Sequence, residues 1–375
     1  MFDVIVCGAG PAGAVAATVL SRAGARVLLV DRARFPRHKL CGDTINPGAL
    51  AILRRLGMTA AIEPAARRLD GMIVTGERGV GVRGVYGRGS HALSILRRDL
   101  DMALVTAAVT AGARFEEGVL VRGALVDSAA RRVRGVVLAG RDGRDVRVPA
   151  PIVIAADGRR SRLAMPLGLS RQPATPRRWA IGAYFAGAAG LRPFGEMHVR
   201  RGYYLGVAPV PGDLVNVCLV LSAPFEMGDP AARLRHAVAR DAAVAERFAA
   251  ARMVAPPVVI GPLAVDAVAA GTDGLLLAGD AAGFIDPMTG DGLRFAVRGA
   301  ELAAEAALAA LGGRLRHPHR ALARARAREF GGKWRFNRAL RRLAGSSVSV
   351  ELAGAVAATA PWILRRAIRF AGDVP

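Results

Sequence analysis

The start of the chain combines uniformly apolar runs with a glycine-rich turn. Residues 4–6 are consecutive apolar residues, which predict a β-strand buried on both faces. An alanine-rich run then predicts a helix that ends at Ala23, before Gly24, and residues 26–30 predict a second buried strand. This strand ends in Asp31. The order strand, turn, helix, strand and acid predicts the first unit of a dinucleotide-binding domain.

The turn between this strand and helix contains three glycines at the spacing of a phosphate-binding loop. Gly8 permits a tight turn, Gly10 lets a backbone approach a pyrophosphate, and Gly13 lets the helix pack closely against the strand. The helix N-terminus offers free N–H groups and a partial positive charge to phosphate. Asp31, about 20 residues beyond the glycines, is placed to accept hydrogen bonds from ribose hydroxyls.

Beyond Asp31 the pattern departs from a regular alternation of strands and helices. Residues 32–43 form a basic loop where a nicotinamide-type domain continues with another strand and helix, and this difference favours a flavin-binding fold. Apolar residues at helical spacing predict a helix over 97–111, and a proline at a first turn predicts another over 47–56. Short strands are predicted over 71–75 and 81–85.

The middle of the chain has the pattern of antiparallel sheets. A β-meander with a hairpin turn at Asp142-Gly143 is predicted within 113–149, and a buried strand over 151–156 leads to Asp157-Gly158. From 171 to 260 strands recur and predict a second domain, an antiparallel sheet with one face over a cavity. The predicted strands are 115–121, 132–138, 145–148, 179–186, 196–199, 203–207 and 214–221, and the predicted helix is 230–251.

The last third of the chain returns to the first pattern and then becomes basic. An apolar strand over 274–278 ends in Gly279-Asp280, and a long helix is predicted over 293–311. Residues 316–371 predict two or three basic amphipathic helices, separated by Gly331-Gly332, Gly345 and Pro361. The best candidate for a membrane span, 352–364, is shorter than the roughly 20 residues that a bilayer requires.

Length and cysteine content limit the classes of protein. A chain of 375 residues exceeds what one hydrophobic core usually serves, which predicts two domains and a C-terminal addition. The three cysteines form no CxxC pair, which argues against a disulfide framework and against a zinc site, so no metal is predicted. Met1 leads directly into the first strand, so we expect no signal peptide and a cytoplasmic location.

The net charge of +23 comes almost entirely from arginine. Genomic composition bias is one explanation. The functional alternatives are contact with the anionic inner face of a membrane, an acidic partner, or a diphosphate or carboxylate substrate. Nucleic acid is not predicted, because aromatic residues make up only 5% of the chain and no stacking platform is visible. The basic residues are densest over 314–342 and at Arg365, Arg366 and Arg369, which is typical either of interfacial helices or of an amphipathic cap.

Three motifs in order carry a resemblance to a known family. They are the glycine turn with Asp31, the Asp157-Gly158-x-x-Ser161 segment, and Gly279-Asp280. Together they resemble the FAD-dependent oxidoreductases of the p-hydroxybenzoate hydroxylase fold. Residues 39–43 and 279–292 are most similar to the geranylgeranyl reductase family within it. The resemblance implies an α/β fold in which a Rossmann-like FAD-binding domain (1–70, 92–170 and 258–312) carries an inserted antiparallel-sheet substrate domain (71–91 and 171–257) and C-terminal helices (313–375).

The resemblance also implies which residues bind FAD. The pyrophosphate would lie on the glycine turn, the adenosine ribose at Asp31, a ribityl hydroxyl at Asp280, and the flavin pyrimidine edge at the N–H groups of Gly292 and Leu293. Arg97 has two interpretations, a cofactor contact or a solvated residue at a helix terminus. The full set of implied cofactor-binding residues is Gly8, Gly10, Ala12, Gly13, Asp31, Arg32, Cys41, Gly42, Arg97, Val121, Asp280, Gly292 and Leu293.

Candidate catalytic and substrate residues lie in the basic loop and the second domain. Cys41 follows Arg37, His38 and Lys39, which would activate a thiol as a proton donor; the alternative is a small loop residue without a catalytic role. His38 is more typical of a surface residue, and Asp157-Gly158 of a structural turn. Tyr204 is the candidate substrate-binding residue. It begins a family motif that is degraded here, because Gly206 and Ala208 stand where large rings are usual.

The resemblance leaves the reaction open. A geranylgeranyl-type reductase transfers hydride from reduced flavin to a carbon–carbon double bond of an isoprenoid or another hydrophobic substrate. The alternative is an FAD-dependent monooxygenase that hydroxylates an aromatic or polyketide-type substrate with O2, and NAD(P)H is the expected electron donor. A flavin halogenase is not indicated, because the sequence contains no Trp-x-Trp-x-Ile-Pro stretch. A non-catalytic prenyl-binding protein would leave the phosphate loop and Gly279-Asp280 without a role.

Overall fold

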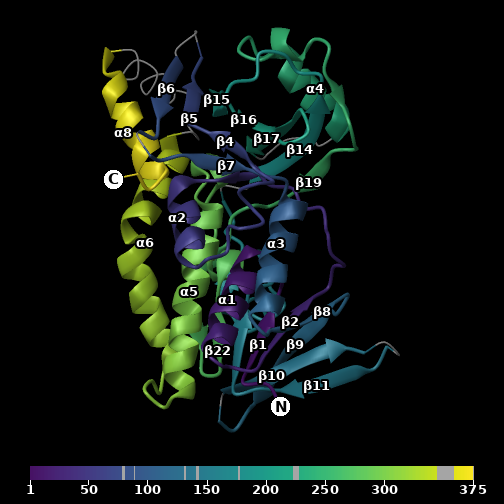
Figure 1. Ribbon diagram of the computed structural model, residues 1–375, viewed down its shortest axis with the longest axis vertical. Coiled ribbons are helices and arrows are strands. Elements are labelled where there is room, and N and C mark those ends of the chain that lie inside the picture. The colour runs from purple at the N-terminus through teal and green to yellow at the C-terminus, as the bar shows by residue number, and fades with distance from the viewer. Residues whose placement is uncertain are drawn as a thin grey trace.

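A computed structural model describes most of the chain, in two main parts that are stacked along its long axis (Figure 1). The described residues are 1–77, 81–87, 89–130, 132–140, 143–175, 178–222, 228–343 and 359–374. The turn residue Asp142 and the separator Gly345, both named above, lie outside these ranges.

The first part is built on a six-stranded sheet. Strand β1 lies at its centre, in parallel register with β2 on one side and β12 on the other, as the buried apolar runs predict. The sheet order is β21-β22-β12-β1-β2-β8, and only β21 runs antiparallel to its neighbour. The strands are β1 (Val4–Cys7), β2 (Val27–Asp31), β8 (Arg114–Glu117), β12 (Ile152–Ala155), β21 (Gly271–Thr272) and β22 (Leu275–Leu277).

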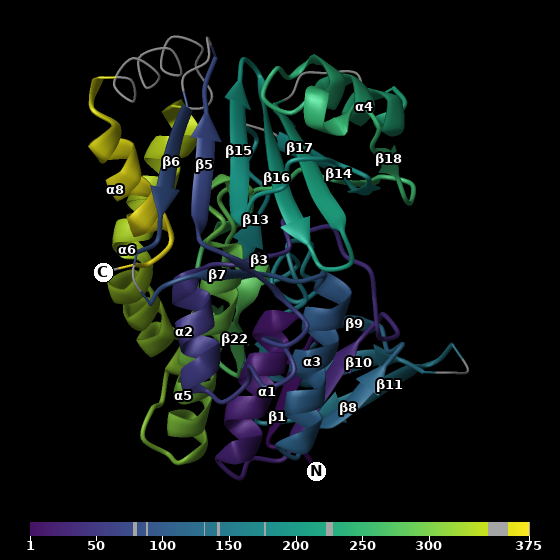
Figure 2. The ribbon, with the colours of Figure 1, turned by 45° about the horizontal axis from the view of Figure 1, so that its top comes forward.

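Helices cover one face of this sheet and a β-meander covers the other (Figures 1 and 2). Helix α1 packs against α3 and α5, and α5 also contacts α2 and α6. The meander of β9, β10 and β11 encloses the second apolar layer of the sheet. The bounds are α1 (Pro11–Arg22), α2 (Pro47–Arg55), α3 (Arg97–Thr110), α5 (Gly292–Leu311), α6 (Pro318–Leu343), β9 (Val121–Asp127), β10 (Arg132–Ala139) and β11 (Asp145–Pro149).

The predicted strand over 115–121 is wrong, because two strands occupy this region. Strand β8 pairs in parallel with β2 and so belongs to the central sheet. Gly118, with φ of +73°, then turns the chain, and the meander begins only at Val121. A left-handed residue cannot continue a strand, so the glycine separates the two elements.

The second part is an antiparallel sheet with a parallel pair inside it. Its order is β18-β14-β17-β16-β15-β5-β6, with β19 also paired to β14, and β15 runs parallel to β5. One face packs under α4 and the other faces the first part. The bounds are β5 (Gly71–Thr75), β6 (Gly81–Val85), β14 (Arg178–Ala186), β15 (Phe194–Arg200), β16 (Tyr203–Val210), β17 (Leu214–Ser222), β18 (Arg252–Met253), β19 (Val258–Ile260) and α4 (Pro230–Arg240).

The predicted helix over 230–251 is too long. Helix α4 ends at Arg240 because Asp241 adopts an extended conformation, with φ of −84° and ψ of 108°. The buried Asp241 carboxylate accepts a hydrogen bond from the Ala243 N–H at 3.0 Å and pairs with Arg200 at 2.8 Å. These contacts stabilise a turn, which leads to a short 3-10 helix, η1 (Glu246–Phe248).

The C-terminal helices run beside both parts. Helix α6 continues through Gly331-Gly332, where the sequence predicts a break, and α8 (Pro361–Ala371) packs on β6. None of the described helices is long and apolar enough to cross a membrane. The remaining elements are β3 (Thr44–Ile45), β4 (Arg67–Leu69), β7 (Ala92–Ser94), β13 (Ser170–Arg171), β20 (Asp266–Ala267), η2 (Gly279–Ala282) and η3 (Pro287–Thr289). The predicted domain boundaries stay a prediction.

Candidate cofactor and substrate site

One cavity of about 930 Å³ lies between the carboxyl ends of the parallel strands and the second sheet. Its volume is in the range of small-molecule and cofactor sites, and its position is the usual one in open α/β sheets. Gly13 does not line it. The predicted residues that do line it are Gly8, Gly10, Ala12, Asp31, Arg32, Cys41, Gly42, Arg97, Val121, Tyr204, Asp280, Gly292 and Leu293.

The glycine turn fits a pyrophosphate. A side-chain carbon at Gly13 would collide with the Gly8 carbonyl oxygen, so this glycine serves the packing of α1 against β1. A side-chain carbon at Gly10 would meet only the tip of the Arg37 side chain, at 3.2 Å, so the backbone here is open to a ligand. Gly10 is the N-cap residue of α1 and provides no side-chain cap, which leaves N–H groups of the first turn free for phosphate oxygens.

Asp31 is fixed for a ribose contact at the end of β2. Its side chain is buried, and its two oxygens accept hydrogen bonds from the N–H groups of Ala9 and Ala33, each at 2.8 Å. Each carboxylate oxygen has a second lone pair, which remains available to a hydroxyl group. The Arg37 guanidinium lies 3.8 Å from the same carboxylate.

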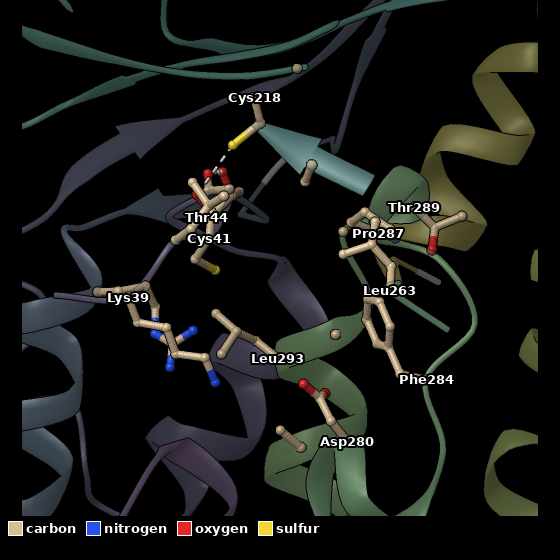
Figure 3. Close-up of a pocket in the computed structure, with 18 of the residues that line it drawn as sticks. Lys39, Cys41, Thr44, Cys218, Leu263, Asp280, Phe284, Pro287, Thr289 and Leu293 are labelled. Atoms are coloured by element: carbon tan, nitrogen blue, oxygen red, sulfur yellow. Dashed lines mark hydrogen bonds between the residues drawn. The ribbon is translucent and has the colours of Figure 1, made fainter. Parts of the chain in front are cut away.

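The second glycine-and-acid corner meets the first. Gly279 has φ of +58° and begins η2, and a side-chain carbon at this position would lie 2.9 Å from Ala12 Cβ. Asp280 therefore lies beside the N-terminus of α1 although it follows β22. Figure 3 shows its carboxylate directed into the cavity beneath Leu293. The predicted meeting of the two corners is present in the fold, and the space between them is continuous.

Arg97 is a buried residue, so its interpretation as a solvated helix terminus is wrong. Its side chain is 5% exposed and donates hydrogen bonds to Asp101 at 2.8 and 3.0 Å. Arg37 lies 3.2 Å from the same Asp101 carboxylate. Burial alone lowers the pKa of Arg97, but the Asp101 carboxylate and a hydrogen bond to the Cys41 side chain produce a net rise. The guanidinium therefore stays charged against the cavity wall.

The loop that carries Cys41 is held against the second sheet by Asp43. Asp43 is 1% exposed and has φ of +51°. One oxygen accepts the Arg97 N–H at 3.1 Å, and the other accepts the Tyr184 hydroxyl at 2.6 Å and the Asn216 amide at 2.5 Å. Burial raises the pKa of Asp43 to about 6.

The residues of this contact were not predicted from the sequence as functional. Tyr184 and Asn216 face each other on β14 and β17, and a correct register alone would have identified them as partners. The Asn216 amide also donates to the Cys41 carbonyl oxygen at 2.7 Å. The Cys218 thiol, two residues further along β17, contacts the same carbonyl oxygen at 3.5 Å. The Cys41 backbone is thus fixed by β17 of the second sheet.

The basic loop brings a thiol and an ammonium group to the cavity. Figure 3 shows Cys41 and Lys39 projecting from this loop towards Leu293 at the start of α5. Lys39 lines the cavity. Desolvation by the surrounding protein lowers the pKa of its ammonium group, and the positive charge of the nearby Arg97 lowers it further. His38 is exposed, as the surface interpretation predicts.

Asp157-Gly158 forms a structural turn beside the cofactor corner. The Asp157 carboxylate accepts the Arg162 N–H at 2.8 Å, and Gly158 has φ of +84°. Burial raises the pKa of Asp157. Both residues also line the cavity, and among the described residues the buried Asp157 Oδ1 has no hydrogen-bond partner.

The side of the cavity that the second sheet covers is mostly apolar. Gly206 on β16 lies between Cys218 of β17 and Met197 of β15, and Met197 pairs with Val74 of β5. This row of side chains crosses the sheet from the Cys41 loop towards β6 and the C-terminal helices. The central position is a glycine, and a side-chain carbon there would have only the Cys218 carbonyl oxygen, at 3.8 Å, within 4 Å, so the cavity is open where the family motif has a large ring.

Tyr204 contributes its ring to the cavity and its hydroxyl to a buried network. The hydroxyl donates to Asp286 at 2.8 Å, and Asp286 is paired with the buried Arg178 at 2.7 Å. Burial raises the pKa of Tyr204 well above its usual range. The negative charge of Asp286 raises it further. This hydroxyl is therefore neutral and already bonded, so a substrate would meet the aromatic face.

Comparisons with known proteins agree with this geometry. Residues 1–212 match the family described as FAD binding domain. The chain is 32% identical to the menaquinone reductase of Mycolicibacterium smegmatis, over 81% of this chain and 75% of that protein. It is 33% identical to digeranylgeranylglycerophospholipid reductase 2 of Methanopyrus kandleri, over 83% of this chain and 78% of that protein. This chain belongs to the FAD-dependent geranylgeranyl reductase family.

The fold extends beyond reductases. The solved structure of a myxobacterial FAD-dependent chondrochloren halogenase superposes with a TM-score of 0.83 and 24% identity, over 89% of this chain and 81% of that one. At this identity the likeness shows the fold alone. As a member of the geranylgeranyl reductase family, the protein is an enzyme, an FAD-dependent oxidoreductase, and FAD is its cofactor.

Proposed function

We propose that this geranylgeranyl reductase family member reduces carbon–carbon double bonds of an isoprenoid or another hydrophobic substrate. The observation that carries the proposal is the single cavity that joins both FAD corners to the apolar face of the second sheet. The two relatives are named as reductases of menaquinone and of digeranylgeranylglycerophospholipid, which supports a hydrophobic substrate. NAD(P)H is the proposed source of electrons.

The residues at the two corners have complementary roles in holding FAD. Gly10 and Ala12 provide N–H groups and space for the pyrophosphate, Asp31 binds the adenosine ribose, and Asp280 binds a ribityl hydroxyl. The N-terminus of α5 at Gly292 and Leu293 is directed at the cavity, and its partial positive charge favours an anionic flavin edge. Arg32 and Val121 complete the adenine end, and Cys41, Gly42 and Arg97 the loop over the flavin. Bound FAD supplies the hydride.

Cys41 is the proposed proton donor. Reduction of an alkene requires a proton at the second carbon, and the Cys41 side chain lies on the cavity wall beside the Arg97 guanidinium. Asn216 donates to the Cys41 carbonyl oxygen, and Asp43 in the same loop accepts the Arg97 N–H. The backbone of the loop is therefore fixed where the thiol delivers its proton to the second carbon.

The reaction is tested by photoreducing the purified protein without air and following the return of the oxidised flavin spectrum. Anaerobic reoxidation by polyprenyl alkenes, with the reduced alkene as product, supports the proposal. Reoxidation that needs O2 and yields a hydroxylated aromatic or polyketide-type compound identifies the monooxygenase alternative and refutes the reductase. Colourless protein without flavin refutes both.

The basic C-terminal helices bear on substrate supply. Hydrophobic isoprenoids reside in membranes, and the protein carries a net charge of +23. We therefore include in the proposal a peripheral contact of these helices with the inner, anionic face of a membrane.

A further inference from the structure

The last helix, α8, turns one of its faces towards the cavity. Leu364, Ala367, Ile368 and Ala371 all line the cavity, and their spacing places them on one side of the helix. Ile368 packs on β6, where a side-chain carbon at Gly84 would lie 2.7 Å from Ile368 Cδ1. Helix α8 is therefore the cavity wall at the edge of the second sheet. It lies at the far end of the row of side chains that begins at Cys218.

The C-terminal end of α8 is fixed by buried contacts. The Gly372 carbonyl oxygen accepts the Gly48 N–H of α2 at 3.0 Å, and the Ala371 carbonyl oxygen accepts the Lys333 ammonium of α6 at 3.0 Å. Asp373 pairs with Lys333 at 2.9 Å and also with Arg294 of α5. These contacts and the cavity-facing side fix the position of the helix.

The outer side of α8 combines large apolar side chains with cations. Trp362 is 64% exposed, Ile363 42% and Phe370 43%. Exposed arginines share this side, at positions 365, 366 and 369. Figure 2 shows α8 on the outside of the molecule, beside β6 and the end of α6. On α6, next to the contact between Phe336 and Phe370, two more arginines, 335 and 338, are exposed.

This arrangement matches the chemistry of an anionic lipid surface. A helix with Trp and aliphatic residues among arginines lies in the plane of a membrane interface, with its rings at the headgroup level and its cations on the phosphates. The net charge of +23 adds long-range attraction to the same surface. An acidic protein would match the arginines but would not account for an exposed Trp that protrudes beside them.

We propose that the outer side of α8 docks on an anionic bilayer and that the substrate enters the cavity along the inner side of this same helix. The inference extends the proposed function, on which its second half rests. A hydrophobic substrate would then pass from the bilayer to the cavity without crossing water, and α8 would be the shared boundary of both.

The test uses the full-length holoenzyme and three variants. Wild type is sedimented with vesicles of phosphatidylcholine, with and without phosphatidylglycerol, at low and high salt. Arg365→Glu/Arg366→Glu and Trp362→Ala alter the outer side of α8. Arg320→Glu/Arg324→Glu is the control, because it makes the same change in net charge at exposed positions near the start of α6, at the opposite end of that helix. Flavin absorbance is recorded for every preparation.

Wild type and the control variant should sediment with phosphatidylglycerol vesicles at low salt and be released at high salt. Binding by the two α8 variants should fall by about tenfold or more. Wild type that stays in the supernatant overturns the docking. Equal loss in the α8 and control variants also overturns it, because net charge would then explain the binding.

The proposed function fails in a different way. A protein that binds vesicles through α8 but does not reduce hydrophobic alkenes refutes the reductase and leaves the docking intact. If both hold, Arg365→Glu/Arg366→Glu should slow turnover of a substrate presented in vesicles and leave turnover of the detergent-dispersed substrate unchanged. Equal turnover of the vesicle substrate by this variant and wild type overturns the role of α8 in substrate entrance.

Discussion

The Tyr184 hydroxyl donates a hydrogen bond of 2.6 Å to the buried carboxylate of Asp43. This contact joins the loop of Cys41 to the sheet that covers the substrate side of the cavity. The same carboxylate oxygen accepts the Asn216 amide at 2.5 Å. A single acidic side chain thus fixes the relative position of the flavin loop and the substrate sheet.

The Asp43 contact predicts a pH dependence of stability. Burial raises the pKa of Asp43 to about 6 from an ordinary value of 3.8, so the folded state holds this proton more tightly than the unfolded state does. Between about pH 4 and pH 6, rising pH therefore removes about 3 kcal/mol of unfolding free energy through this group. In urea unfolding across this range, Asp43→Asn should lack this fall, and its stability relative to wild type should increase with pH.

Tyr184→Phe should change the pH dependence of stability in the opposite direction from Asp43→Asn. The Tyr184 hydrogen bond favours the ionised carboxylate, so its loss should raise the pKa of Asp43 further and extend the fall in stability to higher pH. Parallel curves for wild type, Asp43→Asn and Tyr184→Phe would show that Asp43 does not titrate in this range.

Gly10→Ala tests the pyrophosphate corner without disturbing the apoprotein. The added methyl group meets only the tip of the Arg37 side chain, so the fold should be retained. It occupies the space next to the free N–H groups of α1, and FAD affinity should fall by tenfold or more, about 1.4 kcal/mol or more. Gly123→Ala on β9 is the control, since no heavy atom lies within 4 Å of the added carbon. Unchanged FAD affinity in a folded Gly10→Ala protein would contradict the assignment of this corner.

Cys41→Ala tests the proton donor. Loss of a general acid typically costs about 100-fold or more in turnover, so alkene reduction should fall by this amount while photoreduction of the flavin is unaffected. Cys41→Ser should recover part of the rate because it retains a donor. Cys218→Ala is the matched control at the other cavity thiol. Alkene reduction at the wild-type rate by Cys41→Ala would remove Cys41 from the mechanism.

Iodoacetamide provides a second readout of the same thiol. Burial raises the pKa of both Cys7 and Cys218, so neither should react readily at neutral pH. Cys41 is half-buried and faces the cavity beside Arg97, so it should be alkylated first, and bound FAD should slow the reaction. Peptide mass spectrometry that finds Cys218 modified before Cys41 would contradict this order.

Gly206→Trp tests the substrate side. The nearest atom to an added carbon at Gly206 is the Cys218 carbonyl oxygen at 3.8 Å, so the indole has room to extend into the cavity. It should raise KM for polyprenyl substrates by tenfold or more, about 1.4 kcal/mol, and leave the FAD content unchanged. Gly123→Trp is the control outside the cavity. Unchanged KM in a flavin-loaded Gly206→Trp protein would show that the substrate does not cross this row.

The cofactor corner could be predicted from the sequence because its determinants are local. A strand buried on both faces, three glycines and Asp31 lie within one continuous segment, and each has one steric or electrostatic reason to be there. The second corner at Gly279-Asp280 repeats this local logic after another buried strand. Their meeting follows from the parallel order of β1, β12 and β22, which places both carboxyl ends at one edge.

The errors arose where long-range contacts decide the structure. Helix α6 runs through Gly331-Gly332 because packing on α5, with Phe330 buried against Phe295, outweighs the low helix propensity of two glycines. For Arg97 the sequence left two interpretations open, and its burial depends on Asp101, a carboxylate that also pairs with Arg37 of the distant basic loop. Asp43 could not be assigned because its partners lie on β14 and β17, and their register depends on the whole sheet.

The most direct test of the account is a crystal structure of the purified protein with its bound flavin. We predict one FAD in the cavity, with its adenosine ribose at Asp31, its pyrophosphate at Gly10, a ribityl hydroxyl at Asp280 and its ring between Leu293 and Cys41. An FAD that contacts only one of the two corners, or a flavin bound outside this cavity, would contradict the account.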